Sequence, residues 1–191
     1  MGEAMNATYY RDLLVKHGTT YAAVDAGSQY SHQRRLQVLS EFIPDTHHTI
    51  LDVGCGLGHF IDYGKNWRKE GYLGIDILPE MVEAARKRRP GWHFEIGDIN
   101  EPKPEWAADY VVASGLFQFG NMISIKKSIH TMFGLCRKGL AFDLLRQGHK
   151  DESVASPVAW WYFIYDVTTY FTLRADYLPN DFTLYLYKKK P

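Results

Sequence analysis

From residue 48 onward, short apolar runs alternate with helical stretches, and this alternation constrains the fold more than any other feature of the chain. The runs with the length and composition of buried strands lie at residues 49–53, 72–76, 92–96, 109–113 and 139–145. Helical patterns lie between them at 57–67, 79–89 and 122–136. Parallel strands need crossover connections, so this order predicts a doubly wound α/β fold with a mostly parallel sheet and helices on both faces.

The two ends of the chain are expected to complete this architecture. Residues 170–177 and 182–187 have strand-like patterns and flank the turn sequence Leu178-Pro179-Asn180-Asp181. We therefore expect a C-terminal antiparallel hairpin that brings the sheet to seven strands. Before residue 44 we expect two helices, the second with Ser28 or Ser31 as its N-cap, and we expect an aromatic helix at 158–166.

Composition excludes several classes of protein. The 191 residues carry 22 basic and 22 acidic side chains, a balance that argues against affinity for nucleic-acid phosphates. Two cysteines, Cys55 and Cys136, cannot form a disulfide framework, which favours a reducing compartment. The longest apolar run, 158–165, is far shorter than the ~18 residues of a membrane span, and no signal-peptide pattern is visible. We expect a cytoplasmic protein with no membrane or nucleic-acid partner.

The segment Leu51-Asp52-Val53-Gly54-Cys55-Gly56-Leu57-Gly58 stands where the first strand ends. Glycines there allow a tight turn and close approach of the backbone to a ligand. His59 occupies the place where a dinucleotide fingerprint needs a third small residue. Asp76 closes the next strand at roughly the 20-residue offset from which an acid reaches ribose hydroxyls, and Asp98 follows the third strand.

These segments resemble the motifs of the class I S-adenosylmethionine-dependent methyltransferases. The glycine segment resembles the first motif, Gly74-Ile75-Asp76-Ile77 the second, Gly97-Asp98-Ile99 the third and residues 109–115 the fourth. The resemblance covers residues 48–146 and implies a Rossmann-like methyltransferase fold, with S-adenosylmethionine as cofactor and S-adenosylhomocysteine as product. We expect a single domain, 1–191, that consists of a helical lid (1–46), a cofactor-binding core (47–146) and an aromatic helix with the hairpin (147–191).

The resemblance also implies which residues surround the cofactor. The glycines would pass under its methionine part, whose amino group would lie near Asp52. Asp76 would accept the ribose hydroxyls, and Arg35 (or Arg34) would meet the methionine carboxylate. Two apolar residues would flank the adenine, and Asp98 with its neighbour would hold the adenine amine. The full set implied by the resemblance is Arg35, Asp52, Gly54, Gly56, Gly58, Asp76, Ile77, Met81, Asp98, Ile99 and Ser114.

The methyl acceptor is much less constrained. Residues 113–119 lack the prolines found in methyltransferases that act on amino groups of nucleobases or glutamine, and no metal-ligand spacing appears. The aromatic residues and the neutral charge favour an apolar pocket for a small molecule, with an oxygen or nitrogen nucleophile. The side chains expected around this acceptor are Tyr30, Phe117, Gln118, Tyr162 and Asp166. The candidates for a catalytic base are His32, His149 and Asp143.

Two other functions are compatible with the same pattern. A nicotinamide-dependent oxidoreductase would also use Asp76 on its ribose, although His59 and the absence of a Tyr-x-x-x-Lys pair speak against it. A methyltransferase fold without activity could serve as a binding subunit, although an intact glycine segment disfavours this. The oligomeric state is not determined by the sequence.

Overall fold

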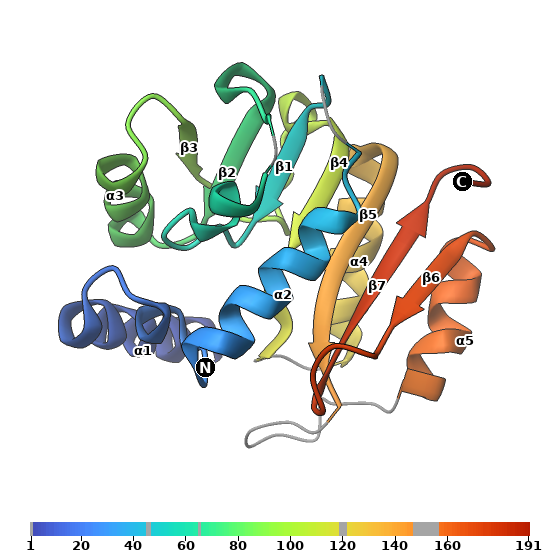
Figure 1. Ribbon diagram of the computed structural model, residues 1–191, viewed down its shortest axis with the longest axis horizontal. Coiled ribbons are helices and arrows are strands. Elements are labelled where there is room, and N and C mark those ends of the chain that lie inside the picture. The colour runs from blue at the N-terminus through green and yellow to red at the C-terminus, as the bar shows by residue number, and fades with distance from the viewer. Residues whose placement is uncertain (1, 45–46, 65, 119–121, 147–156) are drawn as a thin grey trace.

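The computed structural model describes residues 2–44, 47–64, 66–118, 122–146 and 157–191. Their strands form one seven-stranded sheet in the order β3-β2-β1-β4-β5-β7-β6 (Figure 1). The strands are β1 (Ile50–Val53), β2 (Tyr72–Asp76), β3 (His93–Ile96), β4 (Ala108–Ala113), β5 (Cys136–Leu145), β6 (Phe171–Arg174) and β7 (Asp181–Tyr187). Strands β1 to β5 pair in parallel, while β7 is antiparallel to both β5 and β6. The predicted doubly wound sheet with a C-terminal antiparallel hairpin is confirmed.

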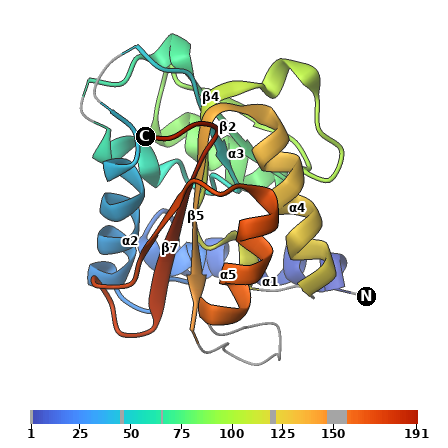
Figure 2. The ribbon, with the colours of Figure 1, turned by 90° about the vertical axis from the view of Figure 1, so that its right-hand side faces the viewer.

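Helices cover both faces of the sheet, which therefore lies between two apolar layers (Figure 2). Helices α2 (Gln29–Glu41) and α3 (Pro79–Arg88) bury their apolar side chains on one face. Helices α4 (Met122–Leu135) and α5 (Pro157–Val167) cover the other. The central strand β1 is buried along its whole length, as expected for a parallel strand covered on both sides. No helix within the described ranges has the length and apolarity to cross a membrane.

Helix α2 begins at the predicted place and packs against the sheet. Ser28 is its N-cap, and Ser28 and Ser31 form a reciprocal capping box in which the Ser31 N–H donates to Ser28 Oγ at 3.0 Å. Leu36 and Leu39 are buried in the same layer as Ile50 of β1. Helix α2 thus belongs to the cover of the sheet.

The predicted helix at 57–67 is wrong, because the chain forms only a short 3-10 turn at His59–Tyr63. Gly58 enters this turn in the left-handed region, Gly64 leaves it in an extended conformation, and Asn66 again has a positive φ. These residues interrupt helical geometry on both sides, so the segment cannot extend into a full helix.

Candidate functional site

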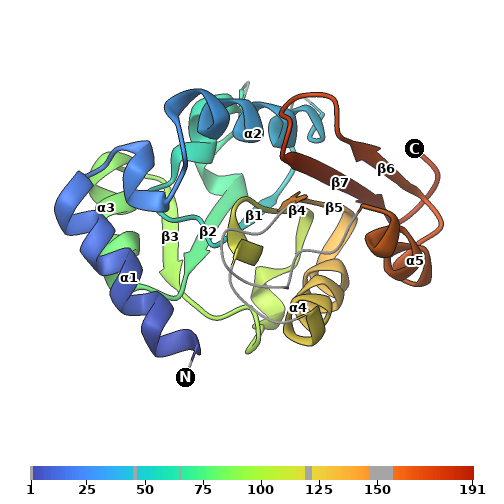
Figure 3. The same cartoon turned by 90° about the horizontal axis from the view of Figure 1, so that it is seen from below.

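Doubly wound sheets bind their ligands at the carboxyl ends of the strands, at the point where the strand order reverses. In this sheet the reversal lies between β1 and β4. Figure 3 looks onto the sheet from below, and helix α1 (Gly2–His17) crosses beneath the β2–β3 side. The predicted site residues that follow β1, β2 and β4 converge on this edge.

The glycine turn after β1 is built from left-handed backbone. Gly54, Gly56 and Gly58 have φ values of 68°, 50° and 65°. A Cβ on Gly54 would lie 2.8 Å from Leu116 Cδ1, and one on Gly58 would lie 2.8 Å from Phe94 Cζ. Other residues would be strained at these positions, so only glycine lets the turn approach its neighbours this closely.

Asp76, at the end of β2, holds the glycine turn in place. Its Oδ2 accepts the Gly56 N–H at 2.9 Å, and its Oδ1 accepts the Leu78 N–H at 2.9 Å. Burial raises the pKa of Asp76, and these backbone hydrogen bonds oppose that shift. Each carboxylate oxygen keeps a further lone pair, so the same group can accept a hydroxyl of a ligand.

Asp52 lies beneath the turn, on the face that α2 covers. It is buried, and its Oδ2 accepts the Tyr72 hydroxyl at 2.6 Å. Burial raises the pKa of Asp52 to about 7, although the Tyr72 hydrogen bond lowers it in part. The neighbouring Cys55 is buried too, and burial raises the pKa of its thiol well above its usual value, which favours a packing role over a nucleophilic one.

The N-terminal segment covers the turn from outside. Ala23 of the 3-10 turn Tyr21–Val24 is buried with Leu57 and Met81, and Tyr10 of α1 packs against this group. Burial and the nearby Asp25 carboxylate raise the pKa of the Tyr10 hydroxyl.

The predicted adenine contacts divide between buried and exposed positions. Met81 is 2% exposed and Ile77 is 54% exposed. Asp98 forms a local turn in which its Oδ1 accepts the Asn100 N–H at 2.8 Å, and the adjacent Ile99 is buried.

Beyond β4, a second carboxylate fixes the turn that faces the glycines. Asp143 of β5 accepts the Ser114 hydroxyl at 2.6 Å and the Gly115 N–H at 2.8 Å. Gly115 has a φ of 66°, and the half-buried Gln118 lies beside it. Phe117 is buried edge-on against Phe142, with ring centroids 5.7 Å apart.

The structure distinguishes the two candidate arginines of α2. Arg34 donates to Gln37 Oε1 at 2.9 Å on the surface of the helix. Arg35 is buried, and its Nε lies 3.6 Å from Asp181 Oδ1 of β7. Its Nη1 also lies 4.0 Å from the place where a Cβ on Gly115 would stand, so Arg35 is the arginine that faces the site.

His32 is held in a pair with His59. The His32 Nε2 lies 3.1 Å from His59 Nδ1, and His59 Nε2 lies 3.1 Å from the Thr19 carbonyl. Burial lowers the pKa of His32 to about 3 and that of His59 to about 4, so both rings are neutral at neutral pH. This pair ties α2 to the glycine turn and to the N-terminal segment.

The remaining predicted acceptor residues lie elsewhere or outside the described ranges. Tyr162 and Asp166 are exposed and line an open hollow with Trp161 and Tyr165 on the outer face of α5, so the structure does not group them with the buried Phe117. Tyr30 is also largely exposed, and His149 falls outside the described residues. Over the described ranges, no group of three or more His, Cys, Asp or Glu side chains is arranged to hold a metal ion.

The sequence patterns do not indicate four polar residues that contact the predicted site residues or one another. Tyr72 donates to Asp52, and Asp181 pairs with Arg35. Thr183 pairs with Asp143 across β5 and β7, and its hydroxyl bonds to that of Tyr177. The pattern of β7 alone gives no signal for Asp181, because its role depends on pairing with β5 and on the position of α2.

Comparisons with known proteins agree with this geometry. Residues 50–139 match a family model described as a methyltransferase domain. Malonyl-acyl-carrier-protein O-methyltransferase of Serratia marcescens is 30% identical over 108 residues, which are 54% of this chain and 40% of that protein. Trans-aconitate 2-methyltransferase of Rhizobium etli is 36% identical over 70 residues, 36% of this chain and 27% of that protein. The chain thus spans less than half the length of these relatives.

Two solved structures share the fold at low sequence identity. One is magnesium protoporphyrin IX methyltransferase from Synechocystis with bound S-adenosylhomocysteine, with a TM-score of 0.67, 12% identity, and coverage of 96% of this chain and 99% of that chain. The other is a TehB-like methyltransferase from Corynebacterium glutamicum, with a TM-score of 0.63, 15% identity, and coverage of 98% and 97%.

Proposed function

Because residues 50–139 form a class I S-adenosylmethionine-dependent methyltransferase domain, we propose that the protein transfers a methyl group from S-adenosylmethionine to an oxygen or nitrogen atom of a small molecule. The observation that carries this proposal is the left-handed glycine turn bonded to Asp76 at the carboxyl edge of the sheet. The alternative of a nicotinamide-dependent oxidoreductase is not retained, because the segment that contains this turn matches a methyltransferase domain.

The residues present fit the cofactor. The glycine turn has no room for side chains at Gly54 and Gly58, which leaves bare backbone at the edge of the sheet. Asp76 retains lone pairs for the ribose hydroxyls, and the buried guanidinium of Arg35 suits the methionine carboxylate. When bound, S-adenosylmethionine supplies an electrophilic methyl group on its sulfonium. We propose that the other residues named above as its contacts, including Asp52, Ile77, Met81, Asp98, Ile99 and Ser114, surround it.

In this proposal the protein acts mainly by positioning. Methyl transfer is an in-line displacement, for which proximity and alignment provide most of the rate enhancement. The Asp143 carboxylate fixes Ser114 and Gly115 opposite the glycine turn. Because Asp143 is buried and both of its hydrogen bonds to described residues go to this turn, we assign it to anchoring the turn rather than to proton abstraction.

We propose a carboxylate oxygen as the acceptor atom. The names of both relatives, malonyl-acyl-carrier-protein O-methyltransferase and trans-aconitate 2-methyltransferase, describe substrates that bear carboxylates. An ionised carboxylate needs no general base at neutral pH. This agrees with the His32–His59 pair, in which His32 Nε2 faces His59 Nδ1 and His59 Nε2 faces the Thr19 carbonyl. Of the side chains expected around the acceptor, we propose that Phe117 and Gln118, next to the turn after β4, contact it.

Our proposal for the whole chain is a single domain in which α1 and the turn at Tyr21–Val24 form a lid over the glycine turn. Two free, buried cysteines support a reducing, cytoplasmic location, and the balanced charge supports a small molecule over a nucleic acid as substrate.

A ligand-stabilisation experiment tests the proposal. We expect S-adenosylhomocysteine to raise the unfolding temperature and NAD to leave it unchanged, because a ligand at 100 times its Kd adds ~2.7 kcal/mol to the stability of the folded state. Transfer of labelled methyl from S-adenosylmethionine to a panel of small carboxylic acids and matched amines then identifies the acceptor. Stabilisation by NAD, or by neither ligand, contradicts the proposed function, and methylation of the amines alone contradicts the carboxylate assignment.

A further inference from the structure

A buried polar cluster joins α2 to the β5–β7 pair beside the candidate site. Asp143 pairs with Thr183 across the two strands, and Leu145 pairs with Asp181, so these side chains share the face that α2 covers. Tyr177 completes the cluster with its hydroxyl 2.8 Å from Thr183 Oγ1. All the polar members are buried, at 4% exposed for Asp143 and 8% for Asp181.

Arg35 is the cationic member of this cluster. Arg35 is 6% exposed, and its Nε has no hydrogen-bond partner among the described residues. Asp181, 3.6 Å away, balances its charge. A buried guanidinium without a carboxylate nearby is strongly disfavoured, so Asp181 determines where this charge can lie.

We infer that Asp181 is a positioning residue for cofactor binding, which holds the Arg35 guanidinium beside Gly115 so that it can receive the carboxylate of S-adenosylmethionine. This inference rests on the proposed function, and it extends the site to the C-terminal hairpin. The ion pair engages the Nε edge of the guanidinium, whereas Nη1 lies toward Gly115, so the donors on the Nη side are the ones placed to receive a ligand carboxylate.

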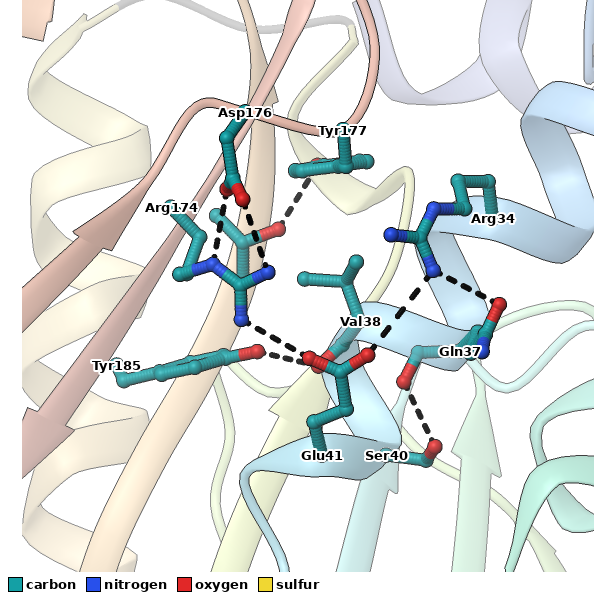
Figure 4. A network of polar contacts seen from close by, with 10 residues as sticks. Arg34, Gln37, Val38, Ser40, Glu41, Arg174, Asp176, Tyr177 and Tyr185 are labelled. Carbon is teal, nitrogen blue, oxygen red and sulfur yellow. Dashed lines mark hydrogen bonds and ion pairs between the residues drawn. The ribbon is translucent and has the colours of Figure 1, made fainter.

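The same hairpin holds α2 through contacts that do not involve Arg35 (Figure 4). Arg174 of β6 donates to Glu41 Oε2 at 2.9 Å, and the Tyr185 hydroxyl of β7 donates to the Val38 carbonyl. Removal of the Asp181 carboxylate should therefore release the guanidinium without releasing the helix. Glu41 provides the matched control, because it links α2 to the same hairpin away from Arg35.

The test compares two ligands by calorimetry on the intact chain. S-adenosylhomocysteine carries the amino-acid part, whereas 5′-methylthioadenosine lacks it. We expect Asp181→Asn to weaken binding of S-adenosylhomocysteine at least fivefold and to leave binding of 5′-methylthioadenosine within twofold of wild type. Asp181→Glu should restore part of the loss, and Glu41→Gln should change neither affinity. Circular dichroism checks folding, and Asp181→Ser replaces Asp181→Asn in the comparison if the latter does not fold.

A double-mutant cycle with Arg35→Met tests whether Asp181 acts through Arg35. In that background, Asp181→Asn should cause no further loss of affinity for S-adenosylhomocysteine. The inference is overturned by unchanged or tighter binding of S-adenosylhomocysteine to Asp181→Asn, by equal weakening of both ligands, or by a full loss that persists without Arg35. A wild-type protein that binds neither ligand would instead overturn the proposed function.

Discussion

Asp76 and Asp181, which lie on the two sides of the carboxyl edge, are held in different ways. On the β1–β2 side, Asp76 is bonded by backbone N–H groups of Gly56 and Leu78. On the β5–β7 side, Asp181 faces the guanidinium of Arg35 from a distant helix. A carboxylate held by backbone is specified by a short stretch of sequence, whereas one held by side chains depends on how distant elements pack. The first side is therefore defined locally and the second only by the complete fold.

The largest expected effect comes from Asp76→Ala on the locally defined side. This change removes the acceptor of two backbone donors and the proposed ribose contact, and hydrogen bonds to charged groups contribute ~1.5–3 kcal/mol each. We expect affinity for S-adenosylhomocysteine, measured by calorimetry, to fall at least tenfold, and the free energy of unfolding in urea to fall by about 2 kcal/mol. Unchanged affinity would remove Asp76 from the site and weaken the contrast between the two sides.

Asp143→Ala probes the side that is defined by packing. It leaves the Ser114 hydroxyl and the Gly115 N–H without their buried acceptor, which costs ~1–3 kcal/mol in comparable cases. We expect a loss of about 2 kcal/mol in urea unfolding, and about half of that for Ser114→Ala, which removes one of the two bonds. Equal losses in the two variants would show that the Gly115 hydrogen bond contributes nothing.

Asp52, on the β1–β2 side, makes the free energy of unfolding depend on pH. Its pKa is about 7 in the folded protein and ~3.9 in an unfolded chain, so between these values the folded state keeps a proton that the unfolded state has lost. Raising the pH from 6 to 7 therefore lowers the stability of the wild type, and Asp52→Asn lacks this dependence. We expect the stability of Asp52→Asn relative to wild type to rise by about 1 kcal/mol over that range in urea unfolding. Asp12→Asn, at an exposed carboxylate, serves as the control, and a pH-independent difference for Asp52→Asn would contradict the assignment.

The smallest effect is expected at the exposed link between α2 and the hairpin. The Glu41–Arg174 ion pair is open to solvent, and such pairs contribute ~0.2–1 kcal/mol. Glu41→Gln should lower the free energy of unfolding by about 0.5 kcal/mol or less, with a still smaller loss at high salt. A loss as large as that of Asp143→Ala would show that this exposed pair, and not the buried cluster, holds α2 on the sheet.

The division between the two sides also explains what could be predicted from the sequence. The sequence predicts a strand at residues 72–76, and β2 lies at Tyr72–Asp76, because its apolar run and its terminal acid are local features. The helix expected at 57–67 is a 3-10 turn, because the apolar pattern there resembles a helix while Gly58, Gly64 and Asn66 interrupt it. The Asp181–Arg35 pair could not be expected, since it depends on strand register and on the position of α2 over the sheet.

The docking of α2 on β7 has a consequence for how the chain acquires its structure. The hydrogen bond between the Tyr185 hydroxyl and the Val38 carbonyl joins residues 147 positions apart. Helix α2 is therefore synthesised well before this strand, and the part of its surface that faces β7 stays uncovered during that interval. Contacts of such large sequence separation slow folding, and exposed apolar surface in intermediates favours aggregation. The arginine side of the site is then complete only when β7 has paired with β5 beside α2, whereas the glycine turn and Asp76 require only β1 and β2.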